Sequence, residues 1–305
     1  MEEGLAEQVN YPVKTRELHN HHMDSTVWNE FRFRDGDVVI GTWAKAGTTW
    51  TQQIVGQLLL GPDPELKATE LAPWLDLRVF PREDILGMLE AQQHRRFIKT
   101  HLPLDALTFS PKAKYIYLAR DARDVVWSLF NHHHNFNDLA YQMFNETPGL
   151  VGPPLPPPPD DIRQYWHQWL DGDGYPFWSF WENVRTWWEA RDLPNVMLLH
   201  FADLKSDMEG RMRDIAAFLE IEIEPAGWPE IVEYCSFDWM KSHSDVVAGG
   251  ADMIFSGGSK AFLYKGVNGR WQDVLSEEEC AEYEAQAIEQ LGAECANWLI
   301  NGARS

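Results

Sequence analysis

Cysteine is scarce in this chain: Cys235, Cys280 and Cys295 are the three thiols among 305 residues. Thiols so few and so scattered favour neither a disulfide framework nor a zinc site. Long apolar runs are also missing, since no stretch approaches the roughly 18 residues that a membrane-spanning helix needs. The first residues are acidic and lack the basic start and apolar run of a signal peptide. Together these absences predict a reducing, cytoplasmic setting.

Positive charge is in short supply. The chain has 26 Lys and Arg against 47 Asp and Glu, which gives a formal net charge of −21. Such a surface repels phosphate backbones and anionic lipid, so we expect neither a nucleic-acid partner nor membrane binding. An anionic substrate would have to be held by a local cluster of cations. Hydrophobic residues make up 44% of the chain, which is enough for a substantial core.

Short apolar runs alternate with stretches of helical periodicity along the chain. The runs are rich in β-branched and aromatic residues, which is typical of parallel strands that are buried on both faces. Strands are expected over residues 37–43, 96–100, 114–119 and 195–201. Helices are expected over residues 48–60, 122–133, 177–191, 207–219 and 277–291. This alternation predicts an α/β fold with a central parallel sheet flanked by helices.

The last predicted helix carries signals at both ends. Ser276, followed three residues later by Glu279, predicts a capping box at its start. Gly292 stands where a C-terminal glycine stop is expected.

Residues 149–161 read GLVGPPLPPPPDD and differ from the rest of the chain. Their prolines exclude a helix or a central strand and favour extended geometry. The segment could link two domains, but strand-helix alternation resumes after it. We therefore expect a single domain over residues 1–305, with residues 149–161 as a rigid surface loop and residues 1–34 at the periphery.

Residues 41–50 read GTWAKAGTTW and follow a predicted strand directly, with a predicted helix next. A strand, a tight glycine turn and a helix N-terminus aim several backbone N–H groups at one point, which is typical of an anion site. Lys45 adds an ammonium there, and Thr48 and Thr49 add hydroxyls. The pattern predicts a P-loop-type nucleotide-binding fold.

The loop differs from the nucleotide-triphosphatase pattern G-x-x-x-x-G-K-[ST], in which lysine directly precedes the hydroxyl residue. Aligning Thr48 with that hydroxyl puts Gly47 in the place of the lysine and Ala46 in the place of the glycine. The lysine of this loop is Lys45, nearer the strand. A nucleotide ligand is therefore supported better than a magnesium-bound triphosphate, and a kinase or nucleotide phosphotransferase is kept as an alternative.

TWAKAGTTW resembles the 5′-phosphosulfate loop of cytosolic sulfotransferases, T-[YF]-P-K-[SA]-G-T-[TN]-W. Other segments resemble that family in the same order: KTHLP (99–103), YIYLARDARDVVWSLFNHH (115–133), CSFDWMK (235–241) and FLYKGVNGRW (262–271). The resemblance, to a bacterial-like member, covers residues 37–275. It implies transfer of the sulfuryl group from 3′-phosphoadenosine-5′-phosphosulfate (PAPS) to a hydroxyl or amine of a small organic acceptor. PAP would be released, and no metal would be required.

The resemblance also implies roles for individual side chains. His101 would be the general base, because an imidazole can take the proton of an attacking hydroxyl near neutral pH. Lys45 would steady the leaving-group oxygen, and Lys99 would help to neutralise the transferring group. Arg120 and Ser128 would bind the 3′-phosphate, the arginine through its fork of donors. Ser128 would also hold the catalytic lysine back from early hydrolysis of PAPS.

The implied donor site extends beyond the phosphates. Trp50 and Phe237 would sandwich the adenine, Phe201 stands where the family often has tyrosine, and Cys235 stands in place of a threonine. The full set of implied donor-binding residues is Lys45, Ala46, Gly47, Thr48, Thr49, Trp50, Arg120, Ser128, Phe201, Cys235, Phe237, Met240, Phe262, Tyr264, Lys265 and Gly266.

One corner of this site departs from the family pattern R-K-G. Tyr264 takes the place of the arginine, which leaves Lys265 and the Gly266 amide to hold the 3′-phosphate. We expect weaker donor binding with marked salt sensitivity, unless Arg123 or Arg270 supplies the missing charge.

Two histidine clusters, at 19–22 and 132–134, do not complete a metal motif, because consecutive histidines on a helix project in different directions. We expect no metal, although a histidine of the second cluster could line the acceptor pocket. A non-enzymatic nucleotide-binding protein is kept as a second alternative, which the joint presence of His101 and Lys45 disfavours. The acceptor and the oligomeric state are left open.

Overall fold

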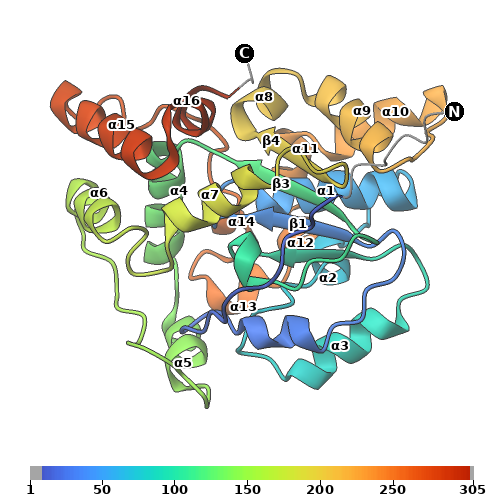
Figure 1. Ribbon diagram of the computed structural model, residues 1–305, viewed down its shortest axis with the longest axis horizontal. Coiled ribbons are helices and arrows are strands. Elements are labelled where there is room, and N and C mark those ends of the chain that lie inside the picture. Colours follow the sequence, from blue (N-terminus) through green and yellow to red (C-terminus); the bar gives the residue numbers. More distant parts are fainter. Residues whose placement is uncertain (1–8, 303–305) are drawn as a thin grey trace, which may run out of the picture.

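The computed structural model describes residues 9–302. Its four parallel strands form one sheet in the order β2-β1-β3-β4, with helices on both faces (Figure 1). The strands are β1 (Val38–Thr42), β2 (Phe97–Thr100), β3 (Lys114–Ala119) and β4 (Val196–His200). The predicted α/β fold with a central parallel sheet is confirmed, and each strand lies within one residue of its expected bounds.

Three long helices match their predicted bounds closely. α1 (Thr48–Leu60) and α15 (Glu277–Leu291) begin and end as expected, and α4 (Ala122–His134) is one residue longer. The capping box at the start of α15 is confirmed: the side chain of Ser276 accepts from the N–H of Glu279, whose carboxylate accepts from the N–H of Ser276.

Two other predicted helices are shorter than the apolar pattern suggested. α7 (Phe180–Glu189) begins after Ser179, whose hydroxyl caps it, and α9 (Met208–Phe218) begins after Asp207, whose carboxylate does the same. In both cases the capping side chain satisfies a free N–H of the first turn and sets the starting residue.

The other helices are short, and the sequence did not specify them. They are α2 (Ala68–Leu71), α3 (Arg82–Ala91), α5 (Asp138–Glu146), α6 (Ile162–Asp171), α8 (Phe201–Ser206), α10 (Trp228–Tyr234), α11 (Phe237–Ser242), α12 (Ser244–Ala248), α13 (Ala251–Ile254), α14 (Gly258–Phe262) and α16 (Ala293–Asn301), with 3₁₀ turns η1 (Ser25–Asn29), η2 (Leu104–Ala106) and η3 (Pro225–Gly227). Phe201 therefore begins a helix, where a strand end was expected. Within residues 9–302, no helix combines the length and apolar character that a bilayer span requires.

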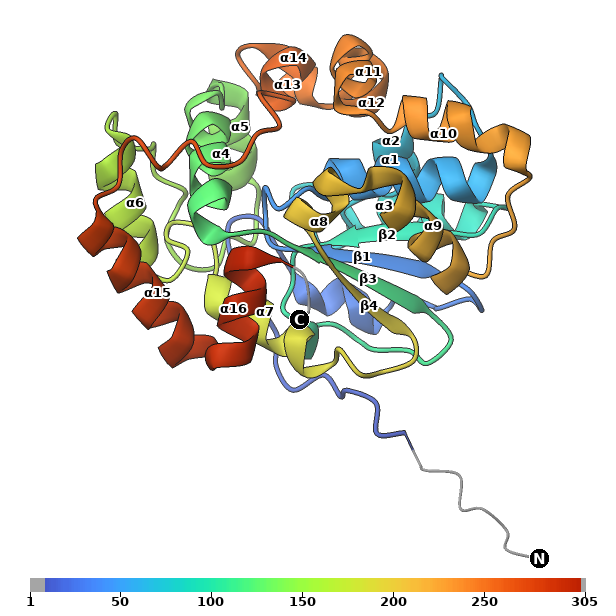
Figure 2. The same cartoon turned by 90° about the horizontal axis from the view of Figure 1, so that it is seen from above.

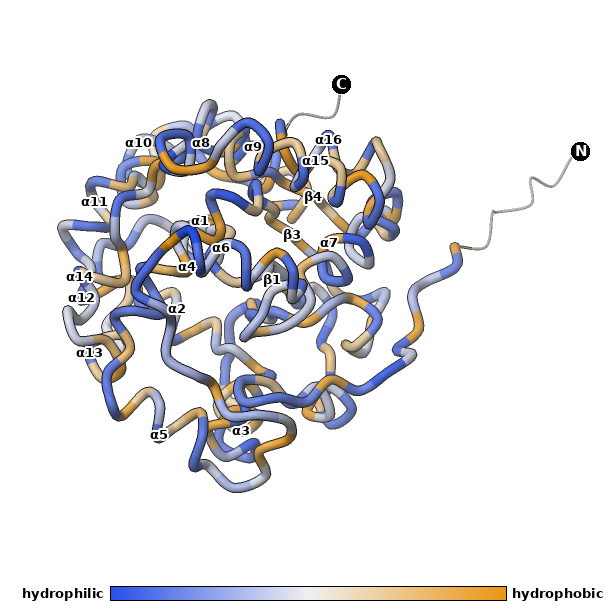
Figure 3. Tube along the Cα trace, turned by 90° about the vertical axis from the view of Figure 1, so that its left-hand side faces the viewer, coloured by the Kyte–Doolittle hydropathy of each residue, from blue (hydrophilic) through white to orange (hydrophobic). Residues whose placement is uncertain are grey.

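The sheet is buried on both faces, which explains why its strands read as continuous apolar runs. Val38 and Ile40 pack on one face with the buried side of α1, whereas Val39 packs on the other face with Tyr115 and Tyr117 of β3. This alternation follows from the two-residue period of a strand. Apolar stretches of the chain run through the strands in Figure 3, and hydrophilic stretches lie mainly on the outer turns.

The strand order reverses at the carboxyl end of the sheet. β1 is central, and the chain leaves it first toward β2 and later returns on its other side as β3. Open parallel sheets bind ligands outside the carboxyl ends of the strands where the order reverses in this way. Here that point lies between the loops that follow β1 and β3. Figure 2 shows the chain after α14 passing across α4 toward α15 near this edge.

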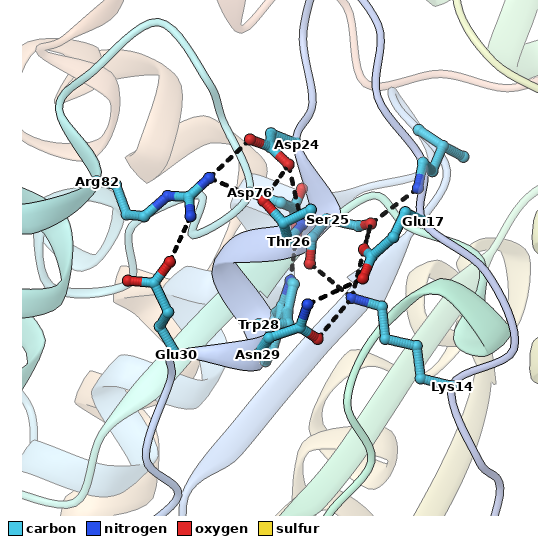
Figure 4. A network of polar contacts seen from close by, with 11 residues as sticks. Lys14, Glu17, Asp24, Ser25, Thr26, Trp28, Asn29, Glu30, Asp76 and Arg82 are labelled. Atoms are coloured by element: carbon cyan, nitrogen blue, oxygen red, sulfur yellow. Dashed lines mark hydrogen bonds and ion pairs between the residues drawn. The ribbon is translucent and has the colours of Figure 1, made fainter.

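The N-terminal segment packs against the sheet. Met23 and Trp28 are fully buried, and the indole of Trp28 donates to Asp76 at 2.8 Å. Arg82 of α3 bonds to Asp24 at 2.8 Å in the same network (Figure 4). Residues 1–8 of the segment expected at the periphery lie outside the described residues.

Residues 149–161 connect α5 to α6 as a loop without helix or strand. His133 Nε2 contacts the Pro156 carbonyl at 2.9 Å, and the same segment lines a pocket of about 260 Å³. At the end of this loop, Glu279 of α15 accepts two hydrogen bonds from Arg163 of α6 and lies 2.8 Å from His167 Nε2. The assignment of the chain to one domain stays a prediction.

Candidate active site

The loop between β1 and α1 has the backbone shape that an anion site needs. Lys45 has φ 67° and Gly47 has φ 119°, so the chain turns sharply before the helix. A Cβ on Gly47 would lie 2.7 Å from the Leu118 side chain and 3.0 Å from the Phe201 ring, which restricts this position to glycine. Among the described residues, no side-chain hydrogen bond caps the N-terminus of α1, so its first N–H groups are available to an anion.

Two threonines and the predicted base form a buried hydrogen-bond network. Thr42, the last residue of β1, contacts Thr48 hydroxyl to hydroxyl at 2.6 Å. His101 follows β2, and its Nδ1 lies 2.8 Å from the Thr42 carbonyl and 3.1 Å from the Thr42 hydroxyl. A carbonyl only accepts, so Nδ1 carries the hydrogen and donates it. The other ring nitrogen, Nε2, is then the basic one.

The surroundings of His101 favour the neutral imidazole. Burial lowers its pKa well below the ordinary value, and the nearby ammonium groups of Lys99 and Lys45 lower it further. The ring packs edge-on against Trp74, with centroids 4.6 Å apart, and stacks on Trp178 at 5.7 Å. A neutral, oriented imidazole can accept a proton from a hydroxyl without first losing one of its own.

Lys45 and Lys99 place two amino groups at the carboxyl end of the sheet. Burial, with the nearby cations Lys99 and Arg120, lowers the pKa of Lys45 to about 7. The Lys45 Nζ lies 3.2 Å from Nδ1 of His132 and 4.5 Å from the centroid of the Phe262 ring. Burial also lowers the pKa of Lys99 to about 8. The Lys99 Nζ lies over the Trp74 ring, 4.6 Å from its centroid.

A buried carboxylate fixes the ring on which Lys99 rests. Both Trp74 and Trp28 donate their indole N–H to Asp76, and the Thr100 hydroxyl donates to it at 2.6 Å. Because Trp74 also contacts His101, this carboxylate links the N-terminal segment to the proposed base.

Arg120 lies at the carboxyl end of β3, with 5% of its surface exposed. Its guanidinium donates to Asn268 Oδ1 at 2.7 and 3.1 Å, to the Val267 carbonyl at 3.1 Å and to the Lys45 carbonyl at 3.3 Å. Burial lowers the pKa of Arg120 to about 10. Ser128 lies on α4, which begins two residues after Arg120, and its side chain is partly buried.

These cations share one property. Within residues 9–302, no ion pair involves Lys45, Lys99 or Arg120. Asp76 acts electrostatically on Lys99, and Asp124 on Arg120, but neither carboxylate is close enough to form an ion pair. A desolvated cation without a paired carboxylate is stabilised by an external anion. The three cations lie near one another, since both Lys99 and Arg120 act on the pKa of Lys45.

The aromatic residues of the predicted donor site lie on three helices, with Trp50 on α1, Phe201 on α8 and Phe237 on α11. The Trp50 indole donates to the Cys235 carbonyl at 2.8 Å and packs edge-on against Phe201 at 5.3 Å. A Cβ on Gly266 would lie 2.5 Å from the Phe237 ring, so the C-terminal loop lies directly on α11. Met240 of α11 and Ala46 of the loop are buried, and the Thr49 side chain is partly exposed.

Arg123 and Arg270 are the two candidates to supply the charge of the arginine that Tyr264 replaces. Arg123 forms a 2.7 Å ion pair with Asp121 and stacks on Trp271 at 3.9 Å, so its charge already has a partner. Arg270 keeps a buried Nε without a partner among the described residues, and it lies 5.4 Å from the centroid of the Tyr264 ring. We therefore expect Arg270 to supply the charge of the arginine that Tyr264 replaces.

Phe262 lies against the Lys45 ammonium and the His132 ring, so its contacts are on the phosphate side of the site. Sequence reasoning missed Trp74 and Asn268 as parts of the site, and it considered the histidines at 132–134 only as a lining of the acceptor pocket. For His132 a signal existed, since it lies one helical turn after Ser128 on α4 and shares its face. Among residues 9–302, no group of three or more His, Cys, Asp and Glu side chains has the arrangement of a metal site.

Comparison with known proteins bears on the whole chain. A family model described as "Sulfotransferase domain" matches residues 35–293. The chain belongs to the sulfotransferase family. This membership confirms the expected transferase activity and PAPS as the sulfuryl donor.

Relatives match the sulfotransferase along most of its length. It is 29% identical over 317 residues to a glycolipid sulfotransferase of Mycobacterium bovis (strain BCG / Pasteur 1173P2), covering 96% of this chain and 97% of the relative. It is 30% identical over 266 residues to sulfotransferase 1B1 of Mus musculus, covering 84% and 83%. Mouse sulfotransferase SULT7A1, solved in complex with PAP, shares the fold with a TM-score of 0.69, 20% identity and coverage of 89% and 90%.

Proposed function

We propose that this sulfotransferase moves the sulfuryl group in line from PAPS to a hydroxyl or amine of a small organic acceptor. His101 acts as the general base, and Lys45 stabilises the leaving phosphate oxygen. Lys99 balances charge on the transferring group, and Arg120 with Ser128 binds the 3′-phosphate. The observation that carries this assignment is a set of three desolvated cations at the carboxyl end of the sheet, buried Arg120 and half-buried Lys45 and Lys99, none of which forms an ion pair within residues 9–302.

The base assignment is supported by the state of the imidazole. Nδ1 of His101 donates to the Thr42 carbonyl, so Nε2 has a free lone pair. The pKa of His101 lies well below its ordinary value because the ring is buried and faces two ammonium groups. The ring is therefore neutral at physiological pH and ready to accept the acceptor's proton as attack proceeds.

The leaving-group assignment is supported by position and charge. Lys45 is in the turn between β1 and the free N-terminus of α1, where backbone N–H groups and an ammonium converge. Donors that are fixed before the reaction stabilise developing negative charge at little cost in reorganisation. Arg120 donates a hydrogen bond to the Lys45 carbonyl and places a second cation at the end of the adjacent strand β3.

The acceptor is proposed to have an apolar body. The rings next to His101 are Trp74 and Trp178, and His22 packs near both, with Phe144 stacked on it at 3.8 Å. Apolar walls with a few polar groups are typical of small-molecule sites. The mycobacterial relative is named for a glycolipid acceptor, so lipid-linked sugars belong in any acceptor panel.

The test is a PAPS-coupled screen of phenols, alcohols, amines and glycolipids with the wild type, His101→Ala and Lys45→Ala. We expect transfer to at least one class without added metal. Loss of the base should lower kcat by about 10²- to 10⁴-fold, as removal of a general base commonly does. PAP affinity should stay close to that of the wild type in His101→Ala.

Near-native turnover of His101→Ala at saturating acceptor would overturn the base assignment. PAP binding without transfer to any acceptor would instead favour a non-enzymatic nucleotide-binding protein. A requirement for Mg²⁺ and ATP would favour the kinase alternative.

A cytoplasmic location is also proposed. Cys235, Cys280 and Cys295 are all free thiols, as expected of a reducing compartment. That the protein has no nucleic-acid or membrane partner stays a prediction from its net charge.

A further inference from the structure

His132 stands between the proposed catalytic lysine and the C-terminal part of the chain. Its Nδ1 lies 3.2 Å from the Lys45 Nζ. An ammonium only donates, so the imidazole accepts through an unprotonated Nδ1 and is the neutral tautomer with its hydrogen on Nε2. Burial and the adjacent Lys45 hold the pKa of His132 well below its ordinary value, which agrees with that neutral state.

Three aromatic rings fix the His132 imidazole. Phe136 lies one turn further along the chain at a centroid distance of 4.9 Å, Phe255 lies at 4.7 Å and Phe262 at 5.7 Å. Phe255 directly follows α13 and Phe262 is the last residue of α14, and Phe262 also faces the Lys45 ammonium at 4.5 Å. The ring orientation is thus set by packing, and the lone pair of Nδ1 points at Lys45.

Backbone pairing holds the two sides of this arrangement together. The Asn137 N–H donates to the Ile254 carbonyl at 3.1 Å, and the Ser256 N–H donates to the Asn135 carbonyl at 2.8 Å. The end of α4 is therefore joined to the segment that carries Phe255, and the imidazole is held on a rigid support.

We propose that His132 is a positioning residue for the sulfuryl transfer, which fixes the Lys45 ammonium at the phosphate loop by accepting its hydrogen bond. The inference rests on the proposed role of Lys45 and goes beyond it. A lysine side chain has several rotatable bonds, and an ammonium in the left-handed turn at residue 45 would otherwise sample many positions. With Nδ1 and the Phe262 face on two sides, the charge stays where the leaving oxygen forms.

Two substitutions separate the acceptor atom from the bulk of the ring. His132→Phe keeps the aromatic volume and removes the lone pair, whereas His132→Asn places a carbonyl oxygen near the position of Nδ1. His134→Phe is the matched control, because His134 is an exposed histidine of the same helix that contacts the Pro159 carbonyl. His132→Gln moves the acceptor away from the Nδ1 position and serves if His132→Phe does not fold.

The first readout is the titration of the Lys45 ammonium, followed by NMR on ¹⁵N-lysine protein and assigned by its loss in Lys45→Arg. The pKa should fall in His132→Phe, because the charged form loses a hydrogen bond. It should return toward the wild-type value in His132→Asn and stay unchanged in His134→Phe. Lys99 and Arg120 are the other charged groups that face Lys45, and His101 nearby is neutral. All three residues are the same in every variant.

The second readout is steady-state kinetics with PAPS. Loss of one hydrogen bond to a charged group should lower kcat about 10- to 100-fold in His132→Phe, with a much smaller change in acceptor KM. His132→Asn should recover most of that loss.

An unchanged Lys45 titration together with an unchanged kcat in His132→Phe would overturn the proposal. Equal losses in His132→Asn and His132→Phe would also overturn it, because bulk alone would then explain the effect. If the wild type transfers no sulfuryl group but its Lys45 titration still depends on His132, the proposed function fails and the positioning of Lys45 is supported.

Discussion

Buried arginines at the two ends of the sheet have different hydrogen-bond partners. At the amino end, Arg96 precedes β2 and binds Asp37, which precedes β1, through contacts of 2.6 and 2.9 Å. At the carboxyl end, Arg120 follows β3 and contacts an amide oxygen and two carbonyls. Both guanidinium groups are almost fully buried, at 1% and 5% exposure.

The difference separates a structural cation from one that is available to a ligand. A buried arginine with a bidentate carboxylate has its charge neutralised inside the protein. An arginine held by neutral oxygens keeps its net charge for an external anion. Lys45 and Lys99 beside it also form no ion pair within residues 9–302, and an anion would favour their charged forms. In a chain of net charge −21, keeping carboxylates more than an ion-pair distance from three neighbouring cations identifies the site.

The largest expected effect on stability is at the amino end. Asp37→Ala leaves Arg96 buried without its partner, which should cost about 3–5 kcal/mol of the free energy of unfolding. Urea denaturation with the linear extrapolation measures the loss. PAP affinity of the folded fraction should stay near that of the wild type, and a stability change below about 1 kcal/mol would show that the pair has no structural role.

At the carboxyl end the balance should reverse. Arg120→Met removes an unneutralised buried charge, so the free energy of unfolding should stay within about 1 kcal/mol of the wild type or rise. PAP affinity should fall about 10- to 100-fold, and the salt dependence of the remaining binding should weaken. Calorimetry at two salt concentrations measures both, with Arg211→Met as an exposed control on α9. Unchanged PAP affinity in Arg120→Met would remove it from the donor site.

The smallest effect is on protonation. Folding lowers the pKa of Lys45 to about 7 and that of Lys99 to about 8 by burial, so the unfolded chain binds more protons at alkaline pH. Stability should therefore rise with pH from about 7 to about 10, and this rise should shrink in Lys45→Met and Lys99→Met.

An anionic ligand favours the charged lysines, so PAP binding at pH 8 should take up protons. Calorimetry in buffers of different ionisation enthalpy measures the uptake. Equal uptake in Lys45→Met and the wild type would contradict the low pKa of Lys45.

The parts of the fold that were predicted are those with strong local signals. The apolar runs located all four strands, and capping side chains such as Ser276 located helix starts. The helices between residues 228 and 262 are four to seven residues long. Isolated helices of that length are unstable in water, so tertiary contacts stabilise them and the local sequence says little about them.

The site divides in the same way. His101, Lys45 and Arg120 belong to segments with a recognisable pattern and were predicted. Trp74 contacts His101, which is 27 positions away in the chain, and Asn268 contacts Arg120, which is 148 positions away. No local pattern encodes such a contact, and it depends on the strand order that brings the loops together.

Glu279 has a consequence for the rim of the molecule. One carboxylate both completes the capping box of α15 and binds Arg163 and His167 on α6. The proline-rich stretch 149–161 therefore leads into α6, which is bound to α15, and the stretch itself is bound to α4 through His133. A loop held at both of these points can change its residues, and with them the shape of the rim, without acting as a hinge.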